Sequence, residues 1–506
     1  MRSRSLSLLP LLCTAALSSG LLPLPAAHAD EPVTELTASE ALDRMDRGRL
    51  SSLEYVNTLL NRADHLQGLN VFISRRERED VLTEAFWSDV RRFLGFRCGR
   101  LEGLPIIVKD NIDSADLPTT AGTPALFSNR PARNAAVLDR LLAEGAILIG
   151  KANMHELAFG TTCNNPATGA VHNPYDVTKI PGGSSGGTAA AIAARIVPFG
   201  LGTDTAGSVR VPSALSGTYG FHPSAGRYSR DGIVLISNTQ DRVGTMARSV
   251  NDLVLLDRVL SDQGSHIPAV PLRGLRLGVD RANFVSNVDP SVSVLFEAAL
   301  VKLQKRGVTV VDISIMPPTD FQNTINALRF SVGFYEAPIN LARYLQGVQP
   351  PLTVQQVANQ IASPDVRGIF FNFLVPGAPL AVSPQTYQAG LAARANLRSA
   401  YATAVQNQRL DGVIFPTTLL PARPIGQDVT VDLNGRQFPT TLIYSQNVVP
   451  GSYAGLAGLS LPIGLTDTGL PVGLELDGLE GSDEAVLGIG LSLEKVFGHL
   501  PAPQLP

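Results

Sequence analysis

The sequence predicts an α/β fold in which a central mixed β-sheet is covered by α-helices on both faces. Three observations favour this fold. Residues 104–151 alternate between apolar, strand-like runs and a helical pattern. A run of small helix-forming residues follows a glycine loop at 182–187 and precedes another apolar strand-like run. Strand-like runs return after residue 411. This order is typical of a mixed or parallel sheet flanked by helices.

Composition excludes several classes of protein. The 506 residues are 44% hydrophobic and 17% charged, which excludes a mostly disordered chain. The net charge is −3 and there is no basic block, so we expect no nucleic-acid partner. There is no C-x-x-C pair and no H-E-x-x-H helix, so we expect no metal and no cofactor. Cys98 and Cys163 are expected to be two isolated buried thiols, and a bridge between them stays open.

The first 29 residues are interpreted as a secretory signal peptide. Arg2 and Arg4 precede an apolar stretch that ends in the A-x-A motif Ala27-His28-Ala29. The alternative is a membrane anchor, against which the prolines in this stretch argue. We therefore expect residues 30–506 to be exported to the periplasm or beyond, without stable membrane insertion.

The first elements can be placed by their apolar periodicity. Residues 39–65 carry apolar residues at helical spacing, with Ser39 as the N-cap. Residues 104–108 are predicted to form a buried strand that ends at Lys109. A helix over 134–144, ended by Gly145, and a strand over 146–151 follow.

Residues 182–187, Gly-Gly-Ser-Ser-Gly-Gly, have the composition of a flexible linker. Their neighbours favour another interpretation. Small helix formers follow at once, and then come a predicted strand at 197–203 and a tight turn at 204–208. A glycine loop between apolar elements is more often a shaped site than a tether.

The second half of the chain predicts a core with an insertion. Residues 315–400 contain aromatic-rich helical segments with few strand signals. We interpret this segment as an insertion between core regions at about 104–250 and 411–490. The later strands are predicted at 412–418, 459–466 and 471–478.

Three polar features at the ends of buried elements fit one way of activating a hydroxyl. A serine such as Ser184 or Ser208 is a weak nucleophile and needs an adjacent base. Lys109 could be that base if burial keeps its amine neutral. The small residues of the turn at 204–208 allow successive N–H groups to point at one spot, as an oxyanion hole requires.

At these residues the sequence resembles the amidase signature family. The motifs that carry the resemblance are LPIIVKDNI, AGTPAL, NMHELAFG, NPYD, PGGSSGGTAAA, GLGTDTAGSVRVPSALSGTYGFHPS and GLPVGLEL. The spacing of Lys109, Ser184 and Ser208 agrees with that family as well. The resemblance implies the family's fold and hydrolysis of an amide C–N bond through an acyl-enzyme, without a cofactor.

The resemblance also implies roles for individual residues. Lys109 is the implied base, Ser184 the bridging serine after a cis peptide bond, and Ser208 the nucleophile. Ala206 stands where the family often has glycine, so we expect the oxyanion hole to differ slightly in shape. The other implied positions are the oxyanion-hole residues Thr205, Ala206, Gly207 and Ser208, the supporting residues Asp204 and Arg210, and Ala158 near the substrate amide.

Other function classes fit the sequence less well. A Ser–His–Asp hydrolase could use His155 or His172, but there is no G-x-S-x-G elbow. A nucleotide-binding loop would need a lysine after Gly187, where Thr188 stands. The fold could also belong to a non-catalytic protein or to an amidotransferase subunit acting on charged tRNA, which the exported N-terminus opposes.

Within the amidases, the motifs most resemble those of indoleacetamide and mandelamide hydrolases, which cleave amides of aryl-substituted acids. We therefore expect a small-molecule amide substrate with an aryl or bulky apolar acyl group. Hydrolysis of peptide amides, anilides or carbamates stays open, as does a homodimer. Some of the aromatic residues of the insertion are predicted to line the acyl pocket: Phe321, Phe330, Phe334, Tyr335, Tyr344, Phe370, Phe371 and Phe373.

Overall fold

The computed structural model describes residues 32–261 and 266–505. The predicted signal peptide over residues 1–29 and its cleavage site lie outside the described residues. Among the helices that are described, none combines the length and the apolar character needed to cross a membrane.

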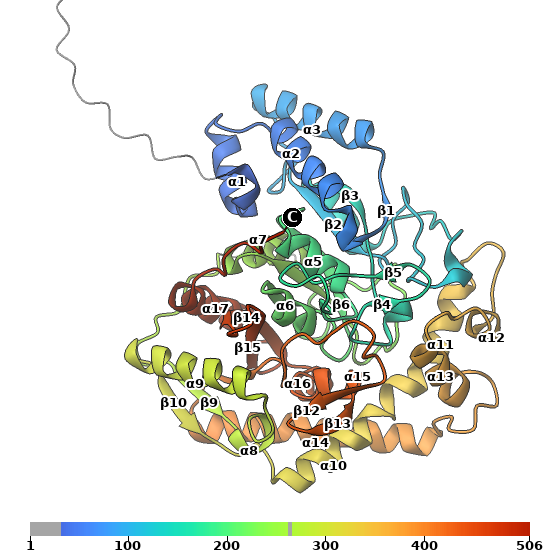
Figure 1. Cartoon of the computed structure of the whole chain (residues 1–506), viewed down its shortest axis with the longest axis vertical. Helices are drawn as coiled ribbons and strands as arrows, with labels where there is room; N and C mark the ends of the chain where they lie inside the picture. Colours follow the sequence, from blue (N-terminus) through green and yellow to red (C-terminus); the bar gives the residue numbers. More distant parts are fainter. Residues whose placement is uncertain (1–31, 262–265, 506) are drawn as a thin grey trace, which may run out of the picture. The chain divides into compact units, whose positions relative to one another are not determined.

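An eleven-stranded mixed sheet forms the centre of the unit Val33–Pro506 (Figure 1). Its strand order is β1-β3-β2-β6-β8-β7-β14-β15-β11-β9-β10. Strand β2 pairs in parallel with β3 and β6, and β9 pairs in parallel with β10 and β11; the other neighbours are antiparallel. The strands are β1 (Phe72–Arg75), β2 (Pro105–Lys109), β3 (Ile147–Ala152), β6 (Phe199–Asp204), β7 (Tyr219–His222), β8 (Arg242–Ala247), β9 (Arg276–Val279), β10 (Thr309–Asp312), β11 (Gly412–Pro416), β14 (Ala457–Leu465) and β15 (Pro471–Gly478).

The predicted mixed sheet is confirmed, and the six strands that the sequence predicted correspond to β2, β3, β6, β11, β14 and β15. Two small ribbons lie outside the main sheet and were not predicted. They are β4 (Asn164–Asn165) with β5 (Gly169–Ala170), and β12 (Thr430–Leu433) with β13 (Arg436–Pro439).

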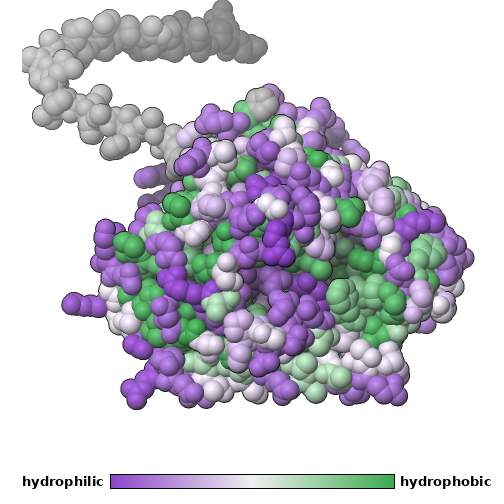
Figure 2. Space-filling view, turned by 60° about the horizontal axis from the view of Figure 1, so that its bottom comes forward, coloured by the Kyte–Doolittle hydropathy of each residue, from purple (hydrophilic) through white to green (hydrophobic). Residues whose placement is uncertain are grey.

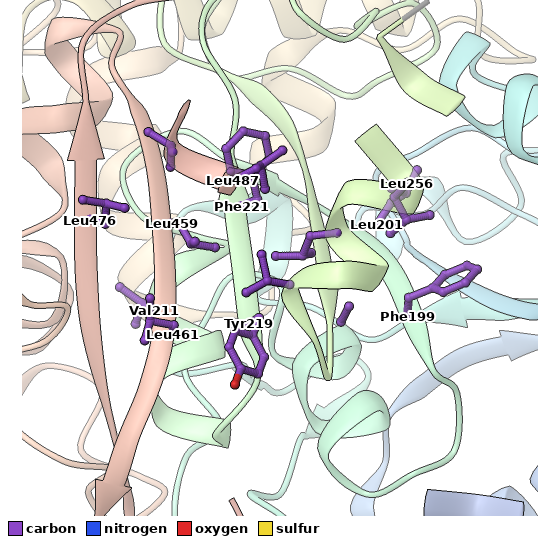
Figure 3. Packing of buried hydrophobic residues seen from close by; sticks show 14 of the residues in the cluster. Phe199, Leu201, Val211, Tyr219, Phe221, Leu256, Leu459, Leu461, Leu476 and Leu487 are labelled. Atoms are coloured by element: carbon purple, nitrogen blue, oxygen red, sulfur yellow. The ribbon is translucent and has the colours of Figure 1, made fainter. Parts of the chain in front are cut away.

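Helices cover both faces of the sheet, as the alternation of side chains along β2 shows. Ile106 and Val108 belong to one buried cluster, whereas Ile107 belongs to another on the opposite face. Figure 3 shows part of the first cluster, where Leu256 and Leu487 pack towards the strands. The helices that contribute to this cluster include α1 (Ala38–Asp46), α4 (Ala136–Ala143), α7 (Val250–Leu260), α9 (Pro290–Lys305) and α17 (Asp483–Phe497). The Ile107 cluster takes residues from α2 (Ser52–His65), α3 (Arg78–Phe93) and α5 (Gly186–Ala193).

Helix α5 packs so closely that glycine is needed around it. A Cβ added at Gly187 would lie 2.3 Å from the carbonyl oxygen of Asn153. A Cβ at Gly200 of β6 would lie 2.8 Å from the side chain of Thr188 on α5. All eight residues of α5 are buried. The glycine loop that precedes α5 is therefore anchored in the core and is not a flexible linker.

The helical spacing over 39–65 corresponds to two helices, α1 and α2, with a break between them. Gly48 has a φ of +66° in this break, a conformation that a continuing helix cannot contain. Thr37, not Ser39, caps α1 through a capping box with Glu40. The Ser39 hydroxyl donates instead to Asp252 on α7 at 2.7 Å, which ties α1 to the core.

The segment 315–400 is helical, and no strand lies between β10 and β11 in this fully described stretch. Its elements are α10 (Pro318–Arg329), α11 (Val332–Leu345), α12 (Val354–Ala358), α13 (Pro364–Ile369), the π-helical turn η5 (Phe370–Leu374) and α14 (Pro384–Gln408). Figure 2 brings forward the region of α10 and α14 and shows green apolar patches among purple polar surface. The remaining short elements are α6 (Arg210–Ser216), α8 (Arg281–Phe284), α15 (Thr440–Ser445), α16 (Val449–Ala454), η1 (Val33–Glu35), η2 (Gln67–Leu69), η3 (Pro124–Leu126) and η4 (Glu156–Ala158).

The two described cysteines are not bridged. Cys163 is buried, as predicted, but the prediction of a buried thiol is wrong for Cys98, which is exposed. Cys98 lies in the loop after α3, where Phe93 and Phe96 are also exposed, so its apolar neighbours in sequence do not signal burial there.

Candidate active site

Lys109 is the last residue of β2 and is completely buried. Its Nζ donates to Ser184 Oγ at 2.7 Å and to Thr203 Oγ1 at 2.8 Å. Because burial penalises the charged amine, it lowers the pKa of Lys109 to about 7. A substantial fraction of the amine is therefore neutral near neutral pH and able to accept a proton.

Ser184 lies in the glycine loop between Pro181 and α5, and the Gly183–Ser184 peptide bond is cis. The Ser184 carbonyl accepts hydrogen bonds from the N–H of His155 at 3.2 Å and from Cys163 Sγ at 3.3 Å. The side chain is buried, and its hydroxyl points to Lys109. The loop thus holds the Ser184 hydroxyl next to the Lys109 amine, whose pKa is lowered by burial.

Ser208 lies in the turn between β6 and α6, and its carbonyl accepts from the N–H of Ser185 at 3.2 Å. Ser208 is 9% exposed, whereas Lys109 and Ser184 are 0% exposed, so Ser208 is the member of this group that a ligand can reach. No hydrogen bond joins the hydroxyls of Ser184 and Ser208, although both residues belong to the part of the chain that the structure describes.

Asp204 and Arg210 hold the turn from the inside. Asp204 accepts from the N–H of Gly207 at 2.6 Å and from the N–H of Val209 at 3.1 Å. Arg210 Nε donates to the same carboxylate at 3.1 Å, and Arg210 Nη1 donates to Glu475 on β15 at 3.0 Å. Burial alone would raise the pKa of Asp204, but the Arg210 guanidinium holds it well below its usual range. Asp204 therefore stays ionised and fixes the turn.

The N–H groups predicted for the oxyanion hole are not equivalent. The N–H of Gly207 is already taken by Asp204, whereas those of Thr205, Ala206 and Ser208 have no acceptor among the described residues. Gly207 has a φ of +107°, and Ala206 does not have a positive φ. Alanine at position 206 is therefore compatible with the turn, since the left-handed residue is the following glycine.

A largely apolar cavity of about 300 Å³ opens next to Ser208. Ala158, named from the sequence, lines it together with Thr205 and Ala206. The full lining is Ala158, Phe159, Gly160, Thr161, Thr205, Ala206, Ser208, Ile236, Gln240, Arg329, Phe330, Gly333, Phe334, Ile369, Phe373, Thr441, Leu442, Ser445, Val449 and Tyr453. The helical segment 315–400 therefore builds one wall of the cavity.

Three of the eight aromatic residues named from that segment line the cavity, namely Phe330, Phe334 and Phe373. Their rings contact one another, with centroids 4.9 Å apart for Phe334 and Phe373. The other five pack elsewhere, for example Tyr344, whose hydroxyl donates to Asp113 at 2.7 Å. That these rings line the acyl pocket stays a prediction, and three of them line the cavity beside Ser208.

Neither of the two histidines considered for a Ser–His–Asp site has a ring hydrogen bond to the hydroxyl of Ser184 or Ser208, all four being described residues. His155 Nε2 is 3.2 Å from Asp365 Oδ2, and its Nδ1 accepts from the N–H of Cys163 at 3.2 Å. His172 Nδ1 is 2.6 Å from the carbonyl of Val177. His155 is thus a structural histidine that ties the core to α13. The described residues contain no cluster of three or more His, Cys, Asp or Glu side chains suited to a metal ion.

Several site residues were missed by the sequence reasoning. Thr203 contacts the Lys109 amine directly, and Asn111 Nδ2 donates to the same threonine hydroxyl at 3.0 Å. Their positions at strand ends beside Lys109 and Asp204 could have indicated both. Gln240, Ser445 and Tyr453 line the cavity from elements far away in the sequence, and no local pattern indicated them.

Comparisons with known proteins agree with this geometry. The family model described as Amidase matches residues 54–487. The chain is 40% identical to an indoleacetamide hydrolase of Agrobacterium vitis over 94% of this chain and 99% of that protein. It is 37% identical to a mandelamide hydrolase of Pseudomonas putida over 94% of each chain. A solved amidase structure superposes with a TM-score of 0.80 at 31% identity, over 92% of this chain and all of that one. The chain belongs to the amidase family.

Proposed function

We propose that this amidase-family hydrolase releases ammonia from primary amides of aryl-substituted or bulky apolar carboxylic acids, through an acyl-enzyme on Ser208. The proposal rests mainly on the position of Ser208, which lines an apolar cavity. The glycine loop lies beside Ser208, and its Ser184 contacts Lys109. The names of the two relatives, hydrolases of indoleacetamide and mandelamide, support an aryl acyl group.

The proposed reaction begins with proton transfer along the serines. Neutral Lys109 accepts the Ser184 proton, while Ser184 takes the proton of Ser208 as the Ser208 oxygen bonds to the substrate carbonyl carbon. Rotation of the Ser208 side chain towards Ser184 completes this relay. The unpaired N–H groups of Thr205, Ala206 and Ser208 stabilise the negative charge on the former carbonyl oxygen.

The C–N bond then breaks, and the leaving nitrogen takes a proton from Ser184, which recovers one from protonated Lys109. This leaves an ester between the acyl group and Ser208. Water attacks that ester and loses its proton through the same relay, which releases the carboxylic acid and restores Ser208. These steps need no group beyond the residues named.

The apolar cavity predicts a strong preference for aryl over small acyl groups. Burying one phenyl ring is worth about 1.5–3 kcal/mol. We therefore expect kcat/KM for phenylacetamide and indoleacetamide to exceed that for acetamide by about 10- to 150-fold, if the burial is present in the transition state. Ammonia release from phenylacetamide, indoleacetamide, acetamide and propionamide measures this. Equal values, or a preference for acetamide, would contradict the proposed acyl pocket.

A pair of matched variants tests whether the cavity causes this preference for aryl acyl groups. Phe334→Ala removes a ring that lines the cavity, whereas Phe371→Ala removes a ring of the same segment that does not. We expect Phe334→Ala to lower the phenylacetamide to acetamide ratio by about tenfold and Phe371→Ala to leave it unchanged. Peptide amides, anilides and carbamates in the same panel test the alternative substrate classes.

We also propose that the chain is exported on its first 29 residues. The support is the order of charged, apolar and A-x-A segments in the sequence. N-terminal sequencing of the protein from the periplasmic and culture fractions of an expressing bacterium tests the proposal. The expected first residue is Asp30, and a protein that keeps Met1 in the cytoplasmic fraction would contradict it.

A further inference from the structure

Arg329, the last residue of α10, lines the Ser208 cavity and also a second cavity of about 480 Å³. Leu442 is shared by the two cavities as well. The second cavity lies among α8, α10, the end of β13 and α15. A guanidinium therefore stands at the boundary of the space that the substrate is proposed to occupy.

The partners of Arg329 are neutral. Its Nη2 is 3.3 Å from Gln446 Oε1, and its side chain also hydrogen-bonds to the buried phenol of Tyr453. None of the ion pairs among the described residues involves Arg329. Arg329 is partly buried. Three buried arginines have a carboxylate partner: Arg210 lies 3.1 Å from Asp204, Arg227 lies 2.6 Å from Asp257, and Arg195 lies 3.0 Å from Glu35. Arg242 and Arg248 are buried without one, but they donate to backbone carbonyls of the core and line neither cavity.

A cation in a mostly apolar cavity costs free energy unless an anion or several acceptors compensate for its lost hydration. The guanidinium has five N–H donors in a planar fork, and two neutral acceptors leave most of that fork unused. A carboxylate fits such a fork in two parallel hydrogen bonds. The missing partner of Arg329 is thus expected on a ligand in the cavity.

We propose that Arg329 forms a subsite for an oxygen acceptor, a carboxylate most strongly, on the acyl group of the substrate away from the scissile amide. This inference rests on the proposed amidase function at Ser208 and narrows its substrate class to aryl amides that carry an anionic or acceptor substituent. It makes Arg329 a specificity-determining residue without a part in the proton relay.

The test compares matched substrates. The three positional isomers of carboxyphenylacetamide are each paired with the methylphenylacetamide of the same substitution pattern, and kcat/KM is measured for all six. For at least one pair, we expect the carboxylated amide to exceed its methyl partner by about tenfold or more in the unmodified enzyme.

Variants then test whether Arg329 causes the preference for carboxylated amides. Arg329→Met is expected to abolish it, and Arg329→Lys to keep part of it, because lysine retains the charge but loses the planar fork. Arg306→Met removes an exposed arginine at the end of α9, outside both cavities, and is expected to keep the full preference. A merely structural role for Arg329 would lower kcat/KM equally for both members of a pair, and that result would overturn the proposal.

Two further results would also overturn it: methyl amides that are better substrates than every carboxylated isomer, or a preference that survives in Arg329→Met. Failure of the amidase proposal would look different, since no phenylacetamide would then be hydrolysed. In that case, calorimetric binding of the same six amides to Ser208→Ala and to Ser208→Ala/Arg329→Met decides the question. Tighter binding of a carboxylated isomer only where Arg329 is present supports the subsite, and equal binding overturns it.

Discussion

Replacement of Ser208 by alanine is expected to lower amide hydrolysis by at least about 10³-fold while the protein stays folded. The variant removes one hydroxyl at a 9% exposed position, and the Ser208 carbonyl keeps its bond to the N–H of Ser185. A fluorophosphonate probe followed by peptide mass spectrometry should place the label on Ser208 in the unmodified protein. Circular dichroism and thermal unfolding check that the fold is retained.

The label has a matched control within the same cavity. Ser445 also lines the cavity, but its hydroxyl donates to the carbonyl of Thr441 at 2.8 Å and lies outside the proposed relay. Ser445→Ala should therefore keep the label, and Ser208→Ala should lose it. A label found on Ser184, or one that persists in Ser208→Ala, would reassign the nucleophile.

Lys109→Met and Lys109→Arg are both expected to abolish turnover, since methionine cannot accept a proton and arginine stays protonated. The pH profile of the unmodified enzyme follows from the same residue. The active form has a neutral amine, which is the form present above the pKa of about 7. The value of kcat/KM should therefore rise as pH increases through about 7 and reach a plateau above it. Substantial activity in Lys109→Arg would show that another group is the base.

A midpoint near pH 7 is also what a histidine would give, so a second variant is needed to assign it. Lys109 Nζ donates to Thr203 Oγ1 at 2.8 Å, a bond that favours the protonated amine. Thr203→Val removes this acceptor at nearly constant volume and should move the midpoint to lower pH. His155→Gln and His172→Gln should leave the midpoint where it is. A midpoint that moves in a histidine variant but not in Thr203→Val would contradict the assignment to Lys109.

The parts of the fold that could be predicted are those with long apolar runs. Strands β2, β3, β6, β11, β14 and β15 are almost wholly buried, so their residues form continuous apolar segments that need no partner to be recognised. Strand β1, by contrast, has four partly exposed residues, Phe72–Arg75, and obtains its strand character from pairing with β3. Because β3 lies far from β1 in the sequence, this pairing leaves no pattern in the residues of β1 itself.

The N-terminal helices show a different limit. Apolar spacing from 39 to 65 is consistent with one helix, because periodicity does not register a break of a few residues. The Ser39 hydroxyl binds Asp252, which lies more than 200 residues away in the chain, while Thr37 caps the helix. The capping box of Thr37 with Glu40 is nevertheless a local motif, so this boundary could have been read from the sequence.

Some residues of the candidate active site can likewise be named from local sequence patterns, and others cannot. Lys109, Ser184 and Ser208 stand in motifs whose residues are close in sequence, so the amino-acid sequence alone is enough to name them. The wall of the cavity can be named from the sequence only in part. Phe334 lies in a segment rich in aromatic residues, which indicates it, but Arg329 and Tyr453 have no motif, and their meeting at the cavity depends on how α10 and α16 pack.

The strand order has a consequence for biosynthesis. The last two strands of the chain, β14 and β15, lie in the interior of the sheet and join β7 to β11. Until residues 457–478 have left the ribosome, β7 and β11 therefore each lack a neighbouring strand, and these additional open edges can pair with other chains. The Glu475 partner of Arg210 also arrives with β15. Arg210, which already pairs with Asp204, thus gains this second buried carboxyl partner only near the end of translation. Truncation by some fifty residues would remove the middle of the sheet instead of trimming its edge.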